Sequence, residues 1–192
     1  MMRIIRELEQ YEPVCEQEAC DRRLMLSYIE QFSDSLLTRG NTLCHFTASA
    51  WITNERFDRV LMVFHNIYRS WSWTGGHADG DAALSRVACR EAGEETGILS
   101  PRLLLEAPIS VEILTVDPHV RRGQFVSAHL HLNLTYLLQA STASHLHENP
   151  DENSGVRWMT PAEAVERSTE QMMKPIYQKL NARLAAYANA LR

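Results

Sequence analysis

Two segments far apart in the chain, residues 45–53 and 126–138, alternate polar and apolar side chains with a period of two. Successive side chains of a β-strand point to opposite faces, so this alternation predicts two strands. The first segment places His45, Thr47 and Ser49 on one face and Phe46, Ala48, Ala50 and Ile52 on the other. Mostly apolar runs predict further strands at 60–64, 103–116 and 155–159. The chain is therefore expected to build a β-sheet.

Helical patterns flank and separate these strands. Residues 1–40 carry apolar side chains at spacings of three and four, including Leu24, Tyr28, Ile29 and Phe32. After a loop at Gly75–Gly76, a helix is predicted at 82–96, with Gly97 as its stop signal. The sequence Thr160-Pro161-Ala162-Glu163 predicts a capping box at the start of another helix. Helices and strands together indicate a mixed α/β fold.

Two polar stretches, 117–123 and 141–154, contain prolines and are predicted to be surface loops. Neither reads as a linker between domains, and the chain has no internal repeat. We therefore expect a single domain over residues 1–192, with a helical extension at 1–44 and a core at 45–192 that ends in a C-terminal helix.

Composition excludes several classes of protein. The chain has 192 residues, a formal net charge of −5 and 45% hydrophobic residues, which is ordinary for a globular domain. Without a strongly basic stretch, binding to a nucleic acid polymer or to a membrane surface is not expected. The four cysteines lack the spacing of metal or redox motifs, and the N-terminus turns acidic too early for a signal peptide. These features favour a cytoplasmic protein.

The predicted helix at 82–96 carries the chemistry. Glu91, Glu94 and Glu95 lie at positions i, i+3 and i+4, so their carboxylates project from nearly one helix face. Such carboxylates repel one another unless a cation joins them, and oxygen ligands favour Mg²⁺ or Mn²⁺ over zinc. Arg90 can orient one of the carboxylates. Taken alone, the three glutamates are also compatible with a solvated acidic helix face.

The stretch from Gly76 to Ile98 resembles the Nudix box, Gly-x5-Glu-x7-Arg-Glu-(apolar)-x-Glu-Glu-x-Gly-(apolar). The matching positions are Gly76, Arg90, Glu91, Glu94, Glu95, Gly97 and Ile98. One position departs from the pattern, because Ala82 replaces the first glutamate; Asp81 precedes it. The resemblance implies a Nudix-type α/β/α sandwich with a mixed central sheet. It also implies hydrolysis of a pyrophosphate bond in a nucleoside diphosphate linked to another moiety.

The resemblance assigns roles to particular residues. Metal ligands are expected at Glu91, Glu94, Glu95 and the carbonyl of Gly76, with Mg²⁺ as the cofactor and Mn²⁺ as a substitute. Catalytic roles are expected for Arg90, Glu94 and a further carboxylate from a later loop, for which Glu152 is the first choice and Asp151 and Glu148 follow. Asp81 is expected to stand in for the glutamate missing at Ala82.

Histidines and tryptophans mark candidate substrate contacts. His129 and His131 share the polar face of the second alternating strand, as His45 does on the first, and His77 follows the box glycine. These faces suit a hydrogen-bonded polar layer, a substrate cleft or, least favoured without companion cysteines, a zinc site. Trp73 either stacks on a nucleobase or packs in the core. The predicted substrate-binding set is His45, Trp73, His77, His129 and His131.

The sequence thus predicts an Mg²⁺-dependent hydrolase of small nucleotide-type substrates, with homodimerisation through residues 1–44 as an option. The alternative, kept open by Ala82, is a Nudix domain that binds a nucleotide without efficient turnover and regulates a partner. No downstream motif identifies the substrate.

Overall fold

The computed structural model describes residues 1–121 and 123–192, apart from the side chain of Arg121. Its strands are β1 (Cys44–Thr53), β2 (Val60–His65), β3 (Ser70–Ser72), β4 (Thr74–His77), β5 (Arg102–Leu103), β6 (Ser110–Val116), β7 (His119–Arg121), β8 (Gln124–Val126), β9 (His129–Gln139) and β10 (Asn153–Met159). The main path of the sheet is β10-β2-β1-β9-β5, with β3 on β2, β4 on β1 and β6 on β9. The central pair β1–β9 is parallel and the other ladders are antiparallel, so the sheet is mixed.

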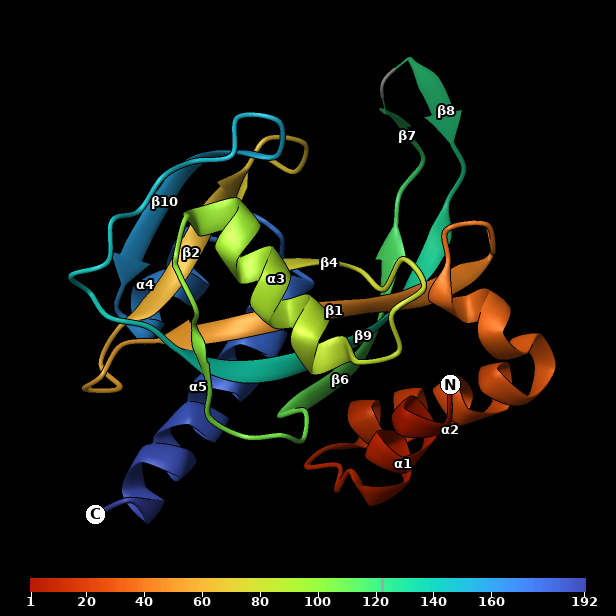
Figure 1. Ribbon diagram of the computed structural model, residues 1–192, viewed down its shortest axis with the longest axis horizontal. Helices are drawn as coiled ribbons and strands as arrows, with labels where there is room; N and C mark the ends of the chain where they lie inside the picture. Colours follow the sequence, from red (N-terminus) through yellow and green to blue (C-terminus); the bar gives the residue numbers. More distant parts are fainter. Residues whose placement is uncertain (122) are drawn as a thin grey trace.

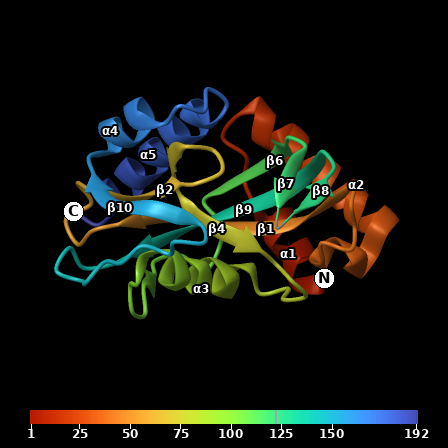
Figure 2. The ribbon, with the colours of Figure 1, turned by 90° about the horizontal axis from the view of Figure 1, so that it is seen from above.

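Helices cover both faces of this sheet (Figure 2). They are α1 (Met2–Gln10), α2 (Glu16–Phe32), the 3₁₀ helix η1 (Ser33–Leu37), α3 (Leu84–Thr96), α4 (Pro161–Arg167) and α5 (Met173–Ala190). Helix α3 lies against one face, and α4 and α5 lie against the other. The predicted α/β/α sandwich with an N-terminal helical region is confirmed.

Successive side chains of β1 point to opposite faces of the sheet and therefore contact different helices. Phe46 and Ala48 belong to the buried cluster that includes Val87 and Ala88 of α3. Trp51, which has the opposite parity, belongs to the cluster packed against α5. The two faces of the central strands therefore have different surroundings: apolar contacts under α3, and a polar layer beside the apolar contacts with α5.

The polar layer contains a buried ion network. Lys179 of α5 places its Nζ 2.8 Å from Glu18 Oε1 of α2 and 2.9 Å from Glu112 Oε1 of β6. Asn133 of β9 donates from Nδ2 to Glu112 Oε2 at 3.3 Å and accepts from Thr47 Oγ1 at 3.1 Å. The hydrogen-bonded polar layer expected for these strand faces is thus present, and it ties the N-terminal region to the sheet and to α5.

Helix α2 runs beside β6 (Figure 1). Gln17 donates to the carbonyl of Val111 at 3.0 Å, and the amide of Ile113 donates to Asp21 at 2.9 Å. These contacts satisfy backbone groups that would otherwise be open at a sheet edge. The predicted apolar stripe of this helix is partly wrong, because Leu24 is 45% exposed.

Three loop and strand predictions are corrected. The strand predicted at 103–116 is two strands, since Pro108 has no N–H for a ladder and falls between β5 and β6. The loop predicted at 117–123 contains β7 and the turn to β8, which form a hairpin that projects from the sheet (Figure 1); position 122 lies outside the described residues. Gly75 and Gly76, predicted in a loop, belong to strand β4.

The predicted helix ends are confirmed. Gly97 follows α3 with a φ of 76°, a left-handed conformation that glycine adopts without strain. The capping box at Thr160 and Glu163 is complete, with Pro161 in the first turn of α4. The first turn of α3 differs slightly from prediction, because the helix begins at Leu84. No helix among the described residues is long and apolar enough to cross a membrane.

Candidate active site

Helix α3 presents its glutamates in two directions. Glu91 and Glu95 are 8% and 4% exposed and lie on the side of the helix that faces the sheet. The side chain of Glu94 is 53% exposed and lies on the outer side. The expectation that all three carboxylates share one face therefore holds closely for Glu91 and Glu95, and Glu94 lies at the margin of that face.

The glycines of β4 make room for the two buried carboxylates. A Cβ at Gly76 would lie 2.2 Å from Cδ of Glu91, a distance that no side chain permits. The amide of Gly75 donates to Glu95 Oε1 at 2.8 Å. Strand β4 thus touches both carboxylates with backbone alone, which explains the glycine pair. The role of Gly76 as a metal ligand stays a prediction.

Arg90 links two of the glutamates. Its Nη2 lies 2.8 Å from Glu91 Oε1, and its Nη1 lies 3.3 Å from Glu94 Oε2. A planar guanidinium with several fixed donors can hold two carboxylates in this way. Arg90 therefore positions the glutamates.

Burial perturbs the carboxyl groups of Glu91 and Glu95. Burial raises the pKa of Glu91 to about 7, and the negative charges of Glu94, Glu152 and Asp79 add to the effect, while Arg90 opposes it. Burial also raises the pKa of Glu95 well above its ordinary range. Clustered, dehydrated carboxyl groups of this kind are typical of sites that receive a cation or handle protons.

Glu152 comes from the loop before the last strand, and its charge raises the pKa of both Glu91 and Glu95. The loop is fixed next to α3, because Asn153 donates from Nδ2 to the backbone carbonyl of Glu95 at 2.9 Å. Asn149 in turn donates to Glu152 Oε2 at 3.2 Å. The structure therefore brings the predicted loop carboxylate to the glutamates of α3.

Ala82 and Asp81 lie where the chain departs from the box pattern. Ala82 packs against the hydrophobic core. Asp81 accepts two hydrogen bonds of 2.8 Å from Arg86 and one of 2.8 Å from the amide of Ala83. Arg86 accordingly lowers the pKa of Asp81. Asp81 thus holds the start of α3 and forms an ion pair with Arg86. Its role as a substitute for the glutamate missing at Ala82 stays a prediction.

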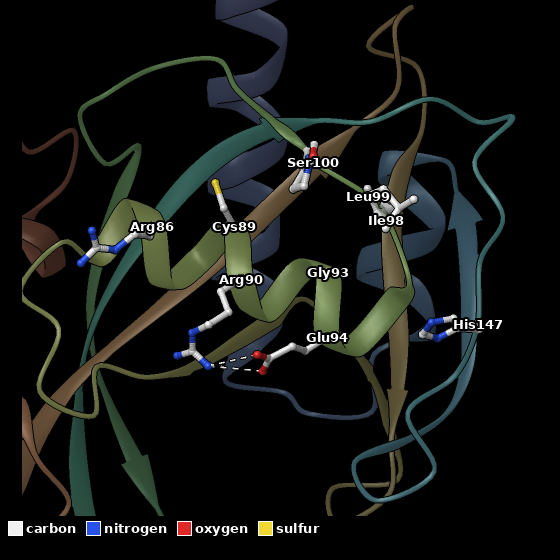
Figure 3. A pocket seen from close by; sticks show the side chains of 10 residues that line it. Arg86, Cys89, Arg90, Gly93, Glu94, Ile98, Leu99, Ser100 and His147 are labelled. Carbon is white, nitrogen blue, oxygen red and sulfur yellow. Dashed lines mark hydrogen bonds and ion pairs between the residues drawn. The ribbon is translucent and has the colours of Figure 1, made fainter.

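A shallow depression of about 630 Å³ runs along the outer side of α3 (Figure 3). Arg90 and Glu94 line it, whereas Glu91 and Glu95 are not among its described lining residues. His147 closes one end and lies against Gly97, where an added Cβ would be 2.6 Å from the imidazole ring. Arg90 and Glu94 therefore border both the depression and the buried carboxylates.

The predicted substrate-binding histidines gather in one cluster. The ring centroid of His45 lies 5.0 to 5.1 Å from those of His77, His129 and His131. Trp73 lies elsewhere: its ring packs edge-on against Tyr177 of α5 at 5.6 Å. The structure thus brings four of the five predicted residues together and places Trp73 in the packing under α5. Their contact with a substrate stays a prediction.

Two contacts near the site were not predicted from the sequence. Gly75 supplies the amide that Glu95 accepts, for which the paired glycines were the available signal. Asp79 of the box loop pairs bidentately with Arg39 at 2.9 and 2.5 Å, so the segment after α2 holds that loop. No local pattern connects residues 39 and 79, and only the fold reveals this pair.

Comparison with known proteins agrees with this geometry. The family model described as the NUDIX domain matches residues 44–180. A NUDIX-family hydrolase from Clostridium perfringens superposes with a TM-score of 0.56 and 20% identity over 74% of this chain and 97% of that one. RenU, a Nudix hydrolase from M. smegmatis, gives 0.54 and 14% over 74% and 86%. The E. coli dihydroneopterin triphosphate pyrophosphohydrolase gives 0.53 and 15% over 70% and 92%. No curated protein sequence matches the chain.

The structure is thus an α/β/α sandwich in which a carboxylate-bearing helix follows a glycine-containing strand. Because the family model covers most of the chain, the protein belongs to the Nudix hydrolase family, whose enzymes hydrolyse pyrophosphate bonds in nucleoside diphosphate derivatives. The prediction of a hydrolase is confirmed at this level.

Proposed function

We propose that this chain hydrolyses a pyrophosphate bond in a nucleoside diphosphate linked to another moiety, and that it requires Mg²⁺, with Mn²⁺ as a substitute. The observation that carries the proposal is the pair of buried carboxylates, Glu91 and Glu95, held against the glycines of β4. Carboxylates buried without enough positive charge are costly, and a cation among them removes this cost.

The donor set fits a hard divalent ion. Glu91, Glu95 and Glu94 offer carboxylate oxygens, and the backbone of Gly76 packs directly against Glu91. In this proposal the carbonyl of Gly76 is the further ligand. Oxygen-only ligands suit Mg²⁺ and Mn²⁺. When bound, such an ion supplies charge that stabilises the phosphoryl oxygens and makes an attacking water more acidic.

The chain's own residues have distinct roles in this proposal. Arg90 fixes Glu91 and Glu94 through its two ion pairs, so that both carboxylates keep their orientation as substrate enters. Glu152 accepts a proton from the attacking water, since its loop stands next to the two buried glutamates. Glu94 is the outermost of the trio and completes the ligand set.

The substrate class is a small nucleotide-type molecule. The similar structures include a dihydroneopterin triphosphate pyrophosphohydrolase, which shows that this fold accommodates a triphosphate in that protein. The proposal also includes a cytoplasmic location, which the composition of the sequence favours, and leaves homodimerisation through residues 1–44 as an option.

The test is a panel of nucleoside diphosphate derivatives assayed with Mg²⁺ and Mn²⁺. The double variant Glu94→Gln/Glu95→Gln keeps side-chain size and removes two charges, and it should lower turnover by about 100-fold or more. Glu30→Gln, an exposed glutamate of α2, is the matched control and should leave turnover unchanged. Unchanged turnover in a folded double variant at saturating Mg²⁺ contradicts the proposed metal site.

Glu152 has its own matched pair. Glu152→Gln should lower turnover and shift the pH profile, because the variant has no carboxylate to accept the proton. Glu148→Gln changes an exposed glutamate of the same loop and should behave like wild type. Equal pH profiles for Glu152→Gln and Glu148→Gln would show that Glu152 is a surface residue that does not accept the proton.

A second function is favoured by one observation, the packing of Ala82 where the box pattern has a carboxylate. It is a Nudix domain that binds a nucleotide and regulates a partner. The same panel separates the two: nucleotide binding in calorimetry without metal-dependent product release supports the binding domain.

A further inference from the structure

A histidine cluster lies on the face of the sheet opposite α3. His45 of β1 and His131 of β9 are partners in the parallel ladder, and His77 of β4 pairs with Thr47, one step along the same face of β1. One nitrogen from each of these three imidazoles lies within 4.8 Å of the other two. Three strands thus bring their imidazoles close enough together to surround one metal ion.

A buried nitrogen of His45 indicates that a ligand binds there. The residue is 4% exposed, and its Nδ1 lies 3.1 Å from the carbonyl oxygen of Asn41. A carbonyl only accepts, so Nδ1 carries the proton and Nε2 keeps its lone pair. That Nε2 is buried without a hydrogen-bond partner among the described residues. A buried acceptor without a partner is costly and is explained when an ion binds there.

Burial favours the neutral, coordinating form of His45 and His131. Burial lowers the pKa of His131 to about 2, and the pKa of His45 is lowered for the same reason. Neutral imidazoles coordinate metals, whereas protonated ones do not. His129 lies with its Nε2 3.2 Å from Nε2 of His131 and has its own Nδ1 2.9 Å from the carbonyl of Ser127. This chain of contacts orients His131, as partners outside a ligand set commonly do.

We propose that His45, His77 and His131 form a second metal site, for a divalent first-row transition ion such as Zn²⁺, with the fourth coordination position open to water. Nitrogen donors suit Zn²⁺, Cu²⁺, Ni²⁺ and Co²⁺ rather than Mg²⁺. The carboxylates of Glu91 and Glu95 lie on the other side of β4 and offer oxygen only. The histidine site is therefore expected to bind transition-metal ions and the carboxylate site Mg²⁺, and each site binds its ion independently of the other.

Cobalt titration of the untagged full-length protein, stripped with EDTA and held in excess Mg²⁺, tests the proposal. Mg²⁺ occupies oxygen sites and does not compete for imidazoles, so we expect one equivalent of Co²⁺ with visible ligand-field bands that Zn²⁺ abolishes. His77→Ala and His131→Asn should each weaken binding by at least about 100-fold. His145→Ala, at a histidine outside the cluster, and Glu94→Gln/Glu95→Gln should each retain one equivalent.

The possible results distinguish a metal site at the cluster from a substrate subsite and from metal binding at the carboxylates. No Co²⁺ or Zn²⁺ binding by wild type in excess Mg²⁺ overturns the proposal, as does loss of the bands in the double glutamate variant. A raised KM in His77→Ala with unchanged Co²⁺ affinity also overturns it, because the cluster would then be a substrate subsite.

Circular dichroism checks that the histidine variants fold. If they do not, X-ray absorption on zinc-loaded wild type replaces them. Scattering from three imidazoles at about 2.0–2.1 Å supports the site, and carboxylate-only coordination refutes it.

Discussion

Glu91→Gln is expected to stabilise the metal-free protein at alkaline pH while removing a proposed metal ligand. Burial holds the pKa of Glu91 at about 7 in the folded chain, against an ordinary value of 4.5. Because the folded-state pKa is raised, the folded chain binds the proton more tightly than the unfolded chain does. Stability is therefore lost as the pH rises from about 4.5 through about 7, and a neutral glutamine avoids that loss.

The size of the effect follows from the same difference. About 2.5 pKa units correspond to about 3 kcal/mol in the free energy of unfolding. Partial hydration of the carboxylate reduces this figure. Glutamine also loses the ion pair with Arg90, which is half-exposed and contributes less than about 1 kcal/mol. A net gain of about 1–2 kcal/mol remains at pH 8, and in a chain of this length it raises the melting temperature by about 2–8 °C.

Urea denaturation of EDTA-treated wild type and Glu91→Gln at pH 5 and pH 8 measures this gain. The variant should be more stable at pH 8 and nearly equal to wild type at pH 5. Glu30→Gln serves as the exposed control and should show no difference at either pH. Adding Mg²⁺ should stabilise wild type more than the variant, by mass action on the folded state. Equal stability of wild type and variant at pH 8 without metal would refute the argument that this carboxylate is buried at a cost.

Three further predictions concern single positions. Gly76→Ala forces the carboxylate of Glu91 aside and should cost about 1–3 kcal/mol in urea denaturation, with loss of Mg²⁺ affinity. Gly40→Ala, whose added Cβ would meet only Thr38 Oγ1 at 3.3 Å, should cost less than about 1 kcal/mol. Lys179→Met removes the cation that the buried Glu18 and Glu112 share and leaves Glu18 with Arg183 at 3.8 Å. The variant should cost about 3–5 kcal/mol at pH 8 and less at pH 5, where a buried carboxylate without its cation takes up a proton more readily. Ala82→Glu adds a carboxylate near the start of α3 and should raise Mg²⁺ affinity in calorimetry by about fivefold, the effect of one charge in a hydrated position.

The sequence predicted the parts of this protein that local physics determines. Alternation of side chains identified β1 and β9, and the glycine and threonine signals identified the end of α3 and the start of α4. It failed at β4, because paired glycines read locally as a loop. Here they serve a tertiary need, the close approach of the strand to Glu91, which becomes visible only when α3 is packed on the sheet.

In the candidate site, too, local sequence predicts some features and tertiary packing determines the others. Spacing along one helix predicted the glutamate trio, but helix geometry alone does not tell which members become buried. Packing of α3 against the sheet buries Glu91 and Glu95 and leaves Glu94 exposed. Pairings across the chain, such as Lys179 with Glu18, have no local signal at all, since either residue alone reads as a solvated charge.

Strand β4 joins these observations, because its last two residues face opposite sides of the sheet. Gly76 faces α3 and makes room for a carboxylate, while His77 faces the imidazoles of β1 and β9. Oxygen donors thus collect on one side of a single strand and nitrogen donors on the other. A shift of β4 by one residue would exchange the two, bringing a side chain against Glu91 and leaving the histidine cluster without its third member. The pairing of β4 with β1 therefore sets both proposed metal sites at once, which predicts that a variant disturbing this ladder loses Mg²⁺ and Co²⁺ binding together, whereas ligand variants lose them singly.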